Sequence, residues 1–490
     1  MVNVLAFDLG ASSGRAVAGT FDGKSIAIRE THRFPNDFVR VGSHLYWDIL
    51  RLFTEVKQGL VAARTQGYSD LRSIGIDAWG VDFGLLDEQG ELLGHPYHYR
   101  DPQTQGMMEE VEQLLPRAEL FARTGIQFMP INTLYQLYSL KKRRSPLLEK
   151  AAHLLLIPEL LRYFLTGERI SEWTIASTTQ LCSPHTRNWD REIIERLDLP
   201  VHVFLEPVAP ATFAGKLLPA IGEEVGLPDV PLTAVAEHDT ASAVVAVPSD
   251  SASFAYLSCG TWSLLGTEVA EPVLSEQALA WNVTNEGGIG STTRLLKNIT
   301  GLWLLQECRR IWRGVGQQIS YEDEAQLITL AEPFLTFIDP DDPLFASPGS
   351  MPELIQQYCR QRGQRVPDTM GAILRCIIES LAMKHRFVLK RIEQLAGQRF
   401  SGLHVVGGGA AHGSLCQWTA NALARPVWAG PQEATAIGNV LVQLMVLGYI
   451  QDLQQARQIV RTSFEIKEYE PVEAERWEEA YQRFLTIIER

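Results

Sequence analysis

The sequence has few of the features that mark membrane, secreted or zinc-binding proteins. Across its 490 residues no apolar run approaches the roughly 18 residues that a membrane-spanning helix needs. The six cysteines form neither a C-x-x-C pair nor a Cys/His cluster with zinc spacing, so we expect mostly small buried side chains. The opening residues, MVNVLAFDLG, lack the basic region and apolar stretch of a secretory signal. We therefore expect a cytoplasmic protein with no membrane contact.

Basic residues are outnumbered as well. The chain holds 44 Lys and Arg against 58 Asp and Glu, a formal net charge of −14. That sign argues against a nucleic-acid-binding surface and favours a freely diffusing enzyme. It does not exclude an anionic substrate, because consecutive backbone N–H groups can hold phosphate inside an acidic protein. No G-x-x-x-x-G-K-[ST] motif occurs, which excludes a P-loop NTPase.

The order of predicted elements indicates an α/β protein of two or three domains. Near the start, strands are predicted at 4–10, 15–21 and 26–34 and a helix at 46–64; residues 107–165 are mostly helical. In the second half, a helix at 371–395, strands at 403–409 and 425–431 and helices at 411–423 and 433–448 follow. In an α/β protein with this order of elements, a ligand lies at the carboxyl ends of the strands.

The two halves share a weak internal repeat. Aligned on Gly10 and Gly260, the segment FDLGAS (7–12) lies over LSCGTW (257–262). Each half is therefore predicted to open with a β-hairpin whose turn offers N–H and hydroxyl donors to an anion.

The first of these turns, GASSG at 10–14, has three possible interpretations. It matches the G-x-S-x-G nucleophile elbow of serine hydrolases, with Ser12 as nucleophile, but the residues that follow are predicted as strand rather than helix. It can cradle phosphate through Ser12, Ser13 and Arg15, with Asp8 placed to hold Mg²⁺. It can also be an ordinary glycine turn with Asp8 as a buried polar residue.

Other polar motifs leave two interpretations open in the same way. In EHDTASA (237–243), Asp239 is either a general base or the N-cap of a helix. The glycines of VVGGGAAHG (405–413) either receive a nucleotide or form a tight turn, and His412 occupies the place of the third glycine of a dinucleotide motif. Asn298, Gln306 and the pair Trp79-Gly80 are ligand contacts or ordinary structural residues.

Taken together and in this order, the motifs resemble those of the FGGY family of carbohydrate kinases. The matching segments extend over most of the chain: DLGASSGR (8–15), IGIDAWGVDF (74–83), YRDPQT (99–104), GIQFMPINTLYQL (125–137), EHDTASAV (237–244), YLSCGTWSLLG (256–266), NEGG (285–288), LLKNITGLWLLQ (295–306) and VVGGGAAHGSL (405–415). The family signature often carries a Lys–Trp stretch where this chain has TLYQL at 133–137. This departure makes the members that phosphorylate L-rhamnulose the better guide.

The resemblance implies a fold of two actin-like (ribonuclease H-like) domains with a central ligand cleft, here expected at 1–245 and 246–490 with a hinge near Pro248–Ser253. It implies transfer of the γ-phosphate of ATP to O1 of L-rhamnulose, with Mg²⁺ at Asp8 and Asp239 as catalytic base. The ketose contacts would be Gly80, His238, Asp239, Thr240 and Asn298. The ATP contacts would be Ala11, Ser12, Ser13, Gly14, Arg15, Thr261, Gln306 and Gly408.

Several alternatives remain open at this point. The chain could be a kinase of another ketose, such as L-fuculose or xylulose, a serine hydrolase, or a non-catalytic actin-like nucleotide sensor. We expect a monomer. The separation of Cys359 and Cys376 resembles that of a cysteine pair in such enzymes, so a disulfide between them is an open question in a reducing compartment.

Overall fold

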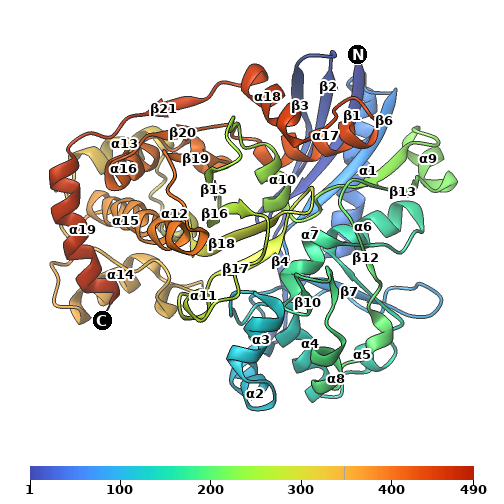
Figure 1. The fold of residues 1–490 in the computed structure, drawn as a ribbon, viewed down its shortest axis with the longest axis horizontal. Helices are drawn as coiled ribbons and strands as arrows, with labels where there is room; N and C mark the ends of the chain where they lie inside the picture. Colours follow the sequence, from blue (N-terminus) through green and yellow to red (C-terminus); the bar gives the residue numbers. More distant parts are fainter. Residues whose placement is uncertain (347, 490) are drawn as a thin grey trace. The chain divides into compact units, whose positions relative to one another are not determined.

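The protein is described by a computed structural model covering residues 1–346 and 348–489 (Figure 1). Its contacts divide the chain into two compact units. The first unit comprises residues 1–250, 268–295 and 434–464, and the second comprises 251–267, 296–433 and 465–490. Both units combine helices and strands, which confirms the predicted α/β class.

The first unit is built on a six-stranded sheet of order β13-β14-β6-β1-β2-β3. The central strands β1, β6 and β14 are parallel, and β2, β3 and β13 run antiparallel to their neighbours. The bounds are β1 (Val2–Leu9), β2 (Ser13–Phe21), β3 (Ile26–Pro35), β6 (Leu71–Ala78), β13 (Thr212–Lys216) and β14 (Pro231–Ala234).

Helices cover both faces of this sheet. On one face, Gly59 of α1 (Ile49–Thr65) leaves room for the Phe7 ring and the Ala16 methyl group. On the other face, Gly19 and Gly75 leave room for side chains of α17 (Ala434–Val446), a helix that comes from the far end of the chain. The strands are consequently apolar on both sides, as expected of a parallel sheet between helical layers.

The second unit contains the strand order β16-β15-β19-β20-β21. β15 and β16 form an antiparallel hairpin, while β15, β19 and β20 are parallel. Three long helices, α15, α16 and α19, pack together around Phe337, Trp477 and Phe484. The bounds are β15 (Ala255–Cys259), β16 (Trp262–Val269), β19 (Leu403–Val406), β20 (Val427–Ala429), β21 (Lys467–Tyr469), α15 (Met370–Ala396), α16 (Gly413–Leu423) and α19 (Ala474–Ile488).

Shorter elements complete the two units. Those of the first are β4 (Phe38–Val41), β5 (His44–Trp47), β7 (Phe83–Leu86), η1 (Pro102–Thr104), α2 (Met107–Leu114), α3 (Arg117–Thr124), α4 (Thr133–Lys142), α5 (Pro146–Glu149), β8 (His153–Leu156), α6 (Ile157–Thr166), β9 (Ser171–Glu172), α7 (Trp173–Ala176), η2 (Ser177–Thr179), β10 (Cys182–Ser183), β11 (Asn188–Trp189), α8 (Arg191–Arg196), η3 (Val201–Val203), β12 (Pro207–Val208), α9 (Pro219–Val225), α10 (Asp239–Val245), α11 (Glu276–Ala280), β17 (Thr284–Gly287) and α18 (Leu453–Ser463). Those of the second are α12 (Trp303–Gly314), α13 (Tyr321–Leu330), η4 (Pro343–Phe345), α14 (Met351–Gln361) and η5 (Gly408–Ala411). Divisions between the units fall within β16, after Thr267, and within β18 (Thr293–Thr300).

The predicted internal repeat is present in the two units. Each contains an antiparallel hairpin, β1–β2 or β15–β16, whose first strand also pairs in parallel with a later strand. In both turns the glycine N–H donates to a nearby carbonyl, from Gly10 to Ser13 at 2.9 Å and from Gly260 to Trp262 at 2.8 Å.

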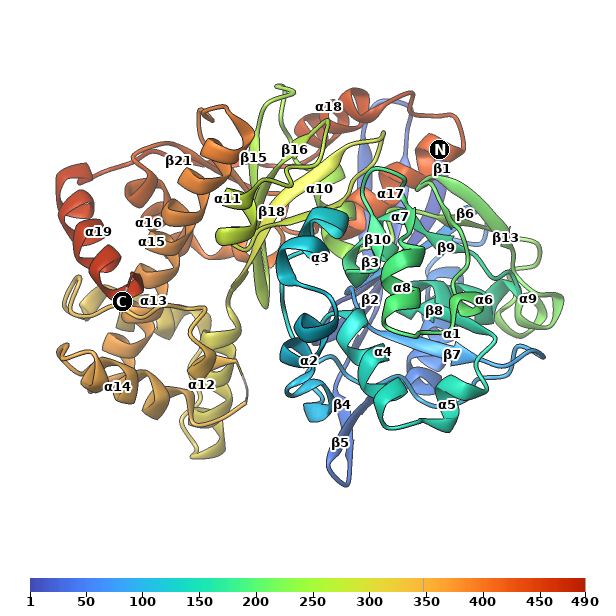
Figure 2. The ribbon, with the colours of Figure 1, turned by 60° about the horizontal axis from the view of Figure 1, so that its bottom comes forward.

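Some predicted elements differ from the observed ones at their ends. The helix expected from residue 46 begins at Ile49, because the Asp48 side chain accepts the N–H of Arg51 and residues 44–47 form β5 instead. The hairpin β4–β5 projects at the bottom of Figure 2. The strand expected at 403–409 ends at Val406, and the following glycines turn into η5.

All six cysteines are buried and carry free thiols. Cys359 and Cys376 are therefore unbonded here, although a hydrogen bond between them lowers the pKa of the Cys359 thiol. Across the described part of the chain, no helix is both long and apolar enough to cross a membrane.

Candidate active site

Three aspartates lie where strands of the first unit end. Asp8 of β1 is the register partner of Asp77 on the parallel strand β6. One residue further on, Ala78 pairs with His238, which brings the start of α10 and Asp239 to the same edge. The carboxyl edge of a parallel sheet is where such folds place their ligands, so this edge is the candidate active site.

Asp239 is the most accessible of the residues at the start of α10, with 29% of its side chain exposed. Its Oδ1 accepts the Thr240 hydroxyl at 3.1 Å and lies 3.4 Å from His238 Nε2. Burial raises the pKa of the Asp239 carboxyl, and the negative charge of Asp8 adds to the effect. A carboxylate that is reachable and more basic than usual is suited to accept a proton.

The alternative interpretation of Asp239 as a helix cap is wrong. The capping position belongs to His238, whose backbone is extended, and Asp239 is the first residue of α10 itself. No side-chain hydrogen bond caps this helix. The carboxylate of Asp239 is thus available for another role.

The turn between β1 and β2 is held by Asn36, a residue that no sequence motif indicated. Asn36, which is buried, donates from Nδ2 to the Gly10 carbonyl at 2.8 Å, and its N–H reaches the Ser12 carbonyl at 3.1 Å. Ser12 itself is exposed, and Ala11 and Ser13 are half-buried. The turn therefore presents its hydroxyl-bearing residues on a fixed backbone.

The serine-hydrolase interpretation of this turn is wrong. A nucleophile elbow requires a helix after the serine, whereas β2 begins at Ser13. Gly14 also has a packing role, because a Cβ atom there would lie 2.3 Å from the Phe34 ring. This contact with Phe34 explains why residue 14 is a glycine, and no bound ligand is needed for the explanation.

Asp8 and Asp77 differ in their partners. Arg15 donates to Asp8 Oδ2 from Nε at 3.0 Å and from Nη2 at 2.7 Å. Asp77 is fully buried; its Oδ2 accepts Asn439 Nδ2 at 2.6 Å, and its Oδ1 has no hydrogen-bond partner among the residues that the structure describes. Burial raises the pKa of Asp77 well above the usual value, and the charge of Asp8 adds to this.

This donor set fits a magnesium ion that is held mainly by phosphate and water. The residues described contain no ready-made group of three His, Cys, Asp or Glu side chains for a metal. Mg²⁺ is usually bound by one or two carboxylates together with substrate phosphates. The unpaired oxygen of Asp77 beside Asp8 is consistent with a cation that arrives with its own ligands.

Behind Asp239, the His238 ring is enclosed by two charged side chains. Its Nδ1 lies 3.0 Å from Arg294 Nη2 and 3.3 Å from Glu286 Oε2. Burial opposes ionisation of Glu286, yet the Arg294 guanidinium and His238 hold the pKa of Glu286 below its usual value. Glu286 belongs to the matched segment NEGG, so the sequence carried a signal for it, but its role at the site was missed.

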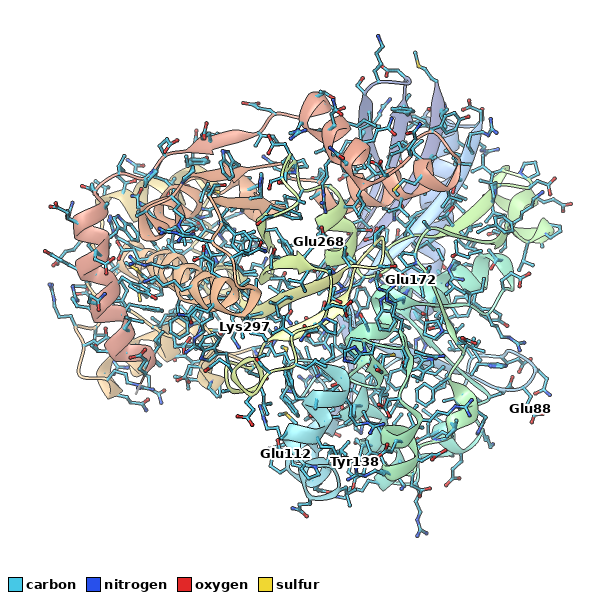
Figure 3. All side chains as sticks on the ribbon, in the orientation of Figure 1. Glu88, Glu112, Tyr138, Glu172, Glu268 and Lys297 are labelled. Atoms are coloured by element: carbon cyan, nitrogen blue, oxygen red, sulfur yellow. The ribbon has the colours of Figure 1, made fainter. Side chains whose placement is uncertain are left out.

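A second group of buried residues contacts Glu237 and His238, the two residues before α10. Glu172, visible in the interior of the first unit in Figure 3, accepts the N–H of Glu237 at 3.2 Å and the hydroxyl of Thr174 at 2.6 Å. Thr174 Oγ1 in turn accepts the N–H of His238 at 3.2 Å. Arg162 forms a fully buried ion pair with Glu237 at 2.7 Å. The sequence offered only one hint, charged residues inside otherwise apolar segments.

Gly80, a predicted ketose contact, lies in the loop after β6. A Cβ on Gly80 would lie only 3.0 Å from the Thr178 hydroxyl oxygen, a close contact. The neighbouring Trp79 is buried, with its ring 4.3 Å from that of Trp47. The first unit thus brings together Asp8 and Asp239 with His238 and Thr240, and holds Gly80 in the loop that continues β6 from Asp77.

In the second unit the structure brings Thr261 and Gln306 together. The carbonyl of Thr261 accepts the N–H groups of Gly301 and Trp303, both at 3.2 Å, which ties the β15–β16 turn to the start of α12. The Thr261 hydroxyl then lies 3.4 Å from Gln306 Oε1. Two predicted ATP contacts from distant parts of the sequence are therefore neighbours.

The glycines at the end of β19 lie against the same hairpin. A Cβ on Gly409 would lie 2.3 Å from the Cys259 sulfur, whereas one on Gly408 would meet nothing within 4 Å. Gly408 thus leaves open backbone for a flat ligand. His412, in the place of a third glycine, caps α16 by accepting the N–H of Leu415 at its Nδ1 at 3.2 Å.

Asn298 is the predicted ketose contact that lies in the second unit, on β18. The other predicted ketose contacts, at positions 80 and 238–240, belong to the first unit. Its role, like the roles of the ATP residues, stays a prediction.

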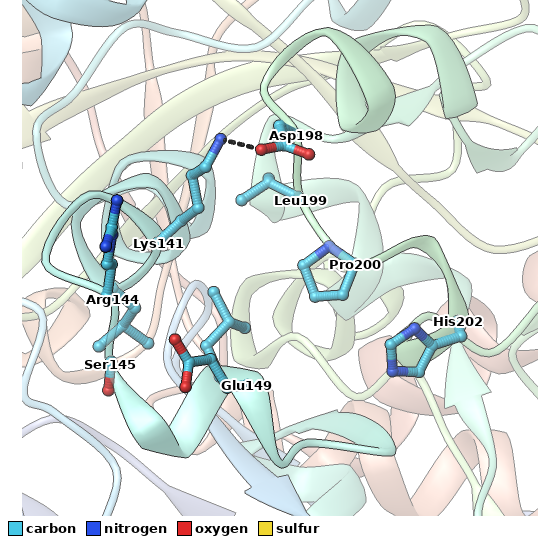
Figure 4. Close-up of a pocket in the computed structure, with 10 residues that line it drawn as sticks. Lys141, Arg144, Ser145, Glu149, Asp198, Leu199, Pro200 and His202 are labelled. Carbon is cyan, nitrogen blue, oxygen red and sulfur yellow. Dashed lines mark ion pairs between the residues drawn. The ribbon is translucent and has the colours of Figure 1, made fainter.

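The first unit also has an open cavity of about 540 Å³ between α4, α5 and the segment after α8 (Figure 4). An ion pair between Lys141 and Asp198 crosses its wall at 2.6 Å. None of the predicted site residues lines it. The candidate active site is therefore at the sheet edge and not in this cavity.

Two family models match the chain over most of its length. The N-terminal domain of the FGGY family of carbohydrate kinases matches residues 3–246, and the C-terminal domain of that family matches residues 255–447.

Curated proteins agree with this match. The chain is 44% identical to the rhamnulokinase of Bacteroides thetaiotaomicron, covering 99% of each chain. It is 43% identical to the rhamnulokinase of Halalkalibacterium halodurans, over 95% of this chain and 98% of the other. The rhamnulokinase of Bacillus subtilis is 39% identical, over 96% of each chain.

Solved structures share the fold at low sequence identity. Xylulose kinase from Lactobacillus acidophilus superposes with a TM-score of 0.81 at 16% identity, covering 100% of this chain and 98% of the other. Glycerol kinase from Plasmodium falciparum has a TM-score of 0.78 at 13% identity, with coverage of 100% and 98%. The two-domain fold, the two matching models and the close relatives lead to one conclusion: this chain belongs to the FGGY family of carbohydrate kinases.

Proposed function

We propose that this carbohydrate kinase transfers the γ-phosphate of ATP to the O1 hydroxyl of L-rhamnulose. The products would be L-rhamnulose 1-phosphate and ADP, in L-rhamnose catabolism. The observation that carries the mechanism is the placement of Asp239, a partly exposed carboxylate of raised pKa at the sheet edge. The choice of substrate is supported by the relatives named rhamnulokinase, which are 39–44% identical over nearly the whole chain.

In the proposed reaction, Asp239 accepts the proton of the O1 hydroxyl as O1 bonds to the γ-phosphorus. The bond between that phosphorus and the bridging oxygen breaks, and ADP leaves with the electron pair. Phosphoryl transfer depends mainly on positioning and neutralisation of charge, so one well-placed carboxylate is sufficient as a base. The contacts from Thr240 and His238 keep its Oδ1 in one orientation.

The remaining roles follow the sequence-based assignments. Gly80, His238, Thr240 and Asn298 would hold the ketose. Asp8 would hold Mg²⁺, which when bound supplies charge neutralisation to the phosphates, while Arg15 fixes the Asp8 carboxylate. The nucleotide would be bound by both glycine turns, through Ala11, Ser12, Ser13, Gly14, Arg15, Thr261, Gln306 and Gly408.

The test is ADP release measured with ATP, Mg²⁺ and a panel of ketoses. We expect the highest kcat/KM with L-rhamnulose and a product whose phosphate is on C1 by phosphorus NMR. A higher kcat/KM with L-fuculose or xylulose would replace the proposed substrate. ADP release that does not respond to any sugar would contradict the proposed activity. The cytoplasmic location and the monomeric state stay predictions.

A further inference from the structure

The loop that carries Gly80 contains a strained turn. Val81 has a φ of 70°, and the N–H of Asp82 donates to the Gly80 carbonyl at 2.9 Å, closing a three-residue turn. A β-branched residue is rarely found in this backbone region, and this type of γ-turn is strained. Such strain persists only where the surroundings impose it, and it is concentrated at functional sites.

Two threonine hydroxyls hold the backbone of Val81. Its N–H donates to Thr178 Oγ1 at 3.2 Å, and its carbonyl accepts the hydroxyl of Thr133 at 2.7 Å. Thr178 is itself fixed, because its hydroxyl donates to the Ile175 carbonyl at 2.8 Å. Both peptide groups of the strained residue are thus bound to side chains from η2 and α4, two elements that are remote from it in the sequence.

The residue after Val81 is held even more tightly. Asp82 is fully buried, and its Oδ2 accepts the indole N–H groups of Trp47 at 2.6 Å and Trp79 at 3.0 Å. Its Oδ1 accepts Gln136 Nε2 at 2.8 Å. The carboxylate therefore fixes the indole of Trp79 on one side of Gly80 and the end of the turn on the other.

The side chains from α4 come from the stretch where this sequence departs from the wider family pattern. Thr133 and Gln136 belong to TLYQL at 133–137, in place of a Lys–Trp stretch, and both are almost fully buried. Both contact the turn at 80–82. The residues that depart from the family pattern are therefore the same residues that hold the strained turn.

We propose that Thr133, Gln136 and Asp82 are positioning residues that set ketose selectivity by holding the loop Trp79–Asp82 in its strained turn. The proposal rests on the proposed role of Gly80 as a ketose contact. A backbone contact discriminates between sugars only if its direction is fixed, and small displacements of a bound substrate are costly. The hydroxyl of Thr133 and the amide of Gln136 supply that fixation.

Thr133→Val removes the hydroxyl bond to the Val81 carbonyl, and Gln136→Met removes the amide bonds to the Asp82 carboxylate and to the Val81 and Ile131 carbonyls. Thr133→Val and Gln136→Met should raise the KM for L-rhamnulose about tenfold or more, while the KM for ATP stays within about twofold. The ratio of kcat/KM between L-rhamnulose and xylulose should fall by a similar factor. Amide exchange in the peptide 79–83 should become faster.

A matched control is available on α3. Thr124 is equally buried, and its hydroxyl donates to the Leu120 carbonyl at 2.8 Å. Thr124→Val removes the same kind of bond and should change neither the sugar KM nor the exchange at 79–83. Thr133→Ser keeps the hydroxyl and should behave like the wild type, so the pair Thr133→Val and Thr133→Ser tests the proposal even if Gln136→Met does not fold.

The outcomes are distinguishable. Faster exchange at 79–83 with unchanged sugar KM and unchanged selectivity would overturn the proposal, as would equal losses in Thr124→Val. A wild-type enzyme that phosphorylates a different sugar would overturn the proposed substrate only. The same variants would then be compared with that sugar, and their selectivity would decide the inference separately.

Discussion

Asp239 illustrates how a single side chain acquires a function from its neighbours. Its type and sequence context allow two roles, and only the extended backbone of His238 and the missing cap bond distinguish between them. The structure also surrounds it with groups that the sequence did not single out, Asp77, Glu286 and Arg294. Asp77 and Glu286 lie in matched segments, but their contacts join residues that lie far apart in the chain, so no local pattern assigns their roles.

Replacement of Asp239, the proposed base, should abolish most of the activity. Asp239→Asn keeps the shape of the side chain but removes the proton acceptor, so kcat should fall by roughly 10²–10⁴. The dissociation constant for ATP, measured by calorimetry, should be nearly unchanged. Near-normal turnover in this variant would show that another group accepts the proton.

The strain at Val81 should be measurable as stability. Glycine adopts a φ of 70° freely, so Val81→Gly should relieve about 1–3 kcal/mol of strain and lose about 0.5–1 kcal/mol through the more flexible unfolded chain. Because Val81 also packs against the core of the first unit, the lost apolar contacts offset part of this relief, and we expect the free energy of unfolding in urea to stay within about 1 kcal/mol of the wild type. As a contrast, Val39 is an exposed residue of β4 with an ordinary strand conformation. Val39→Gly should therefore only lose stability. A loss of more than about 3 kcal/mol in Val81→Gly would exceed what the lost side-chain contacts cost and would contradict a strained turn.

Among the elements, the sequence predicted type and order well and long-range partners poorly. The helix expected at 433–448 is α17 at Ala434–Val446, and the one expected at 371–395 is α15 at Met370–Ala396. The spacing of apolar residues along each helix is a local pattern, so the sequence alone predicts both helices. That α17 packs on β1 and β6 of the first unit, beside α10, depends on residues nearly the whole chain apart, which no periodicity reveals.

The contact between α10 and α17 depends on one glycine. A Cβ on Gly438 would lie 1.8 Å from the Ser242 carbonyl oxygen, so Gly438→Ala must separate the two helices. We expect a loss of about 1–3 kcal/mol in the free energy of unfolding and a lower kcat, since α10 carries Asp239.

Gly314 provides the control for this change. It lies at the end of α12 with nothing within 4 Å of its Cβ position, so Gly314→Ala should be neutral or gain up to about 1 kcal/mol. Unfolding curves of the two variants decide the matter. Equal effects of both would show that backbone propensity, and not the helix contact, is responsible.

At the scale of the whole molecule, the buried carboxylates should make stability depend on pH. Burial raises the pKa of Asp82 to about 7, of Glu159 to about 7 and of Glu172 to about 8. Between pH 5 and 8 these carboxyl groups of the folded protein therefore hold protons that the unfolded chain has released. Burial lowers the pKa of His98 and of His385 to about 3, which opposes this effect below about pH 6.5 but involves fewer groups. Stability should consequently fall as pH rises through this window.

Urea unfolding from pH 5.5 to 8.5 tests this expectation. Glu172→Gln removes one titrating group and should flatten the decline, while losing stability at every pH because its carboxylate accepts several N–H groups. Glu88→Gln, at an exposed position, should leave the slope unchanged. A stability that rises across the window would contradict the assignment of these groups as buried acids.

The burial of all six cysteines has a practical consequence. Thiol reagents should find almost nothing to modify in the folded protein, so an added cysteine would be the sole site of attachment for a dye or spin label. The exposed Glu88 in the first unit and the exposed Glu353 in the second are suitable positions for such a pair. Spectroscopic distances between the two labels could then report how the units respond to sugar and nucleotide, with every native cysteine left in place.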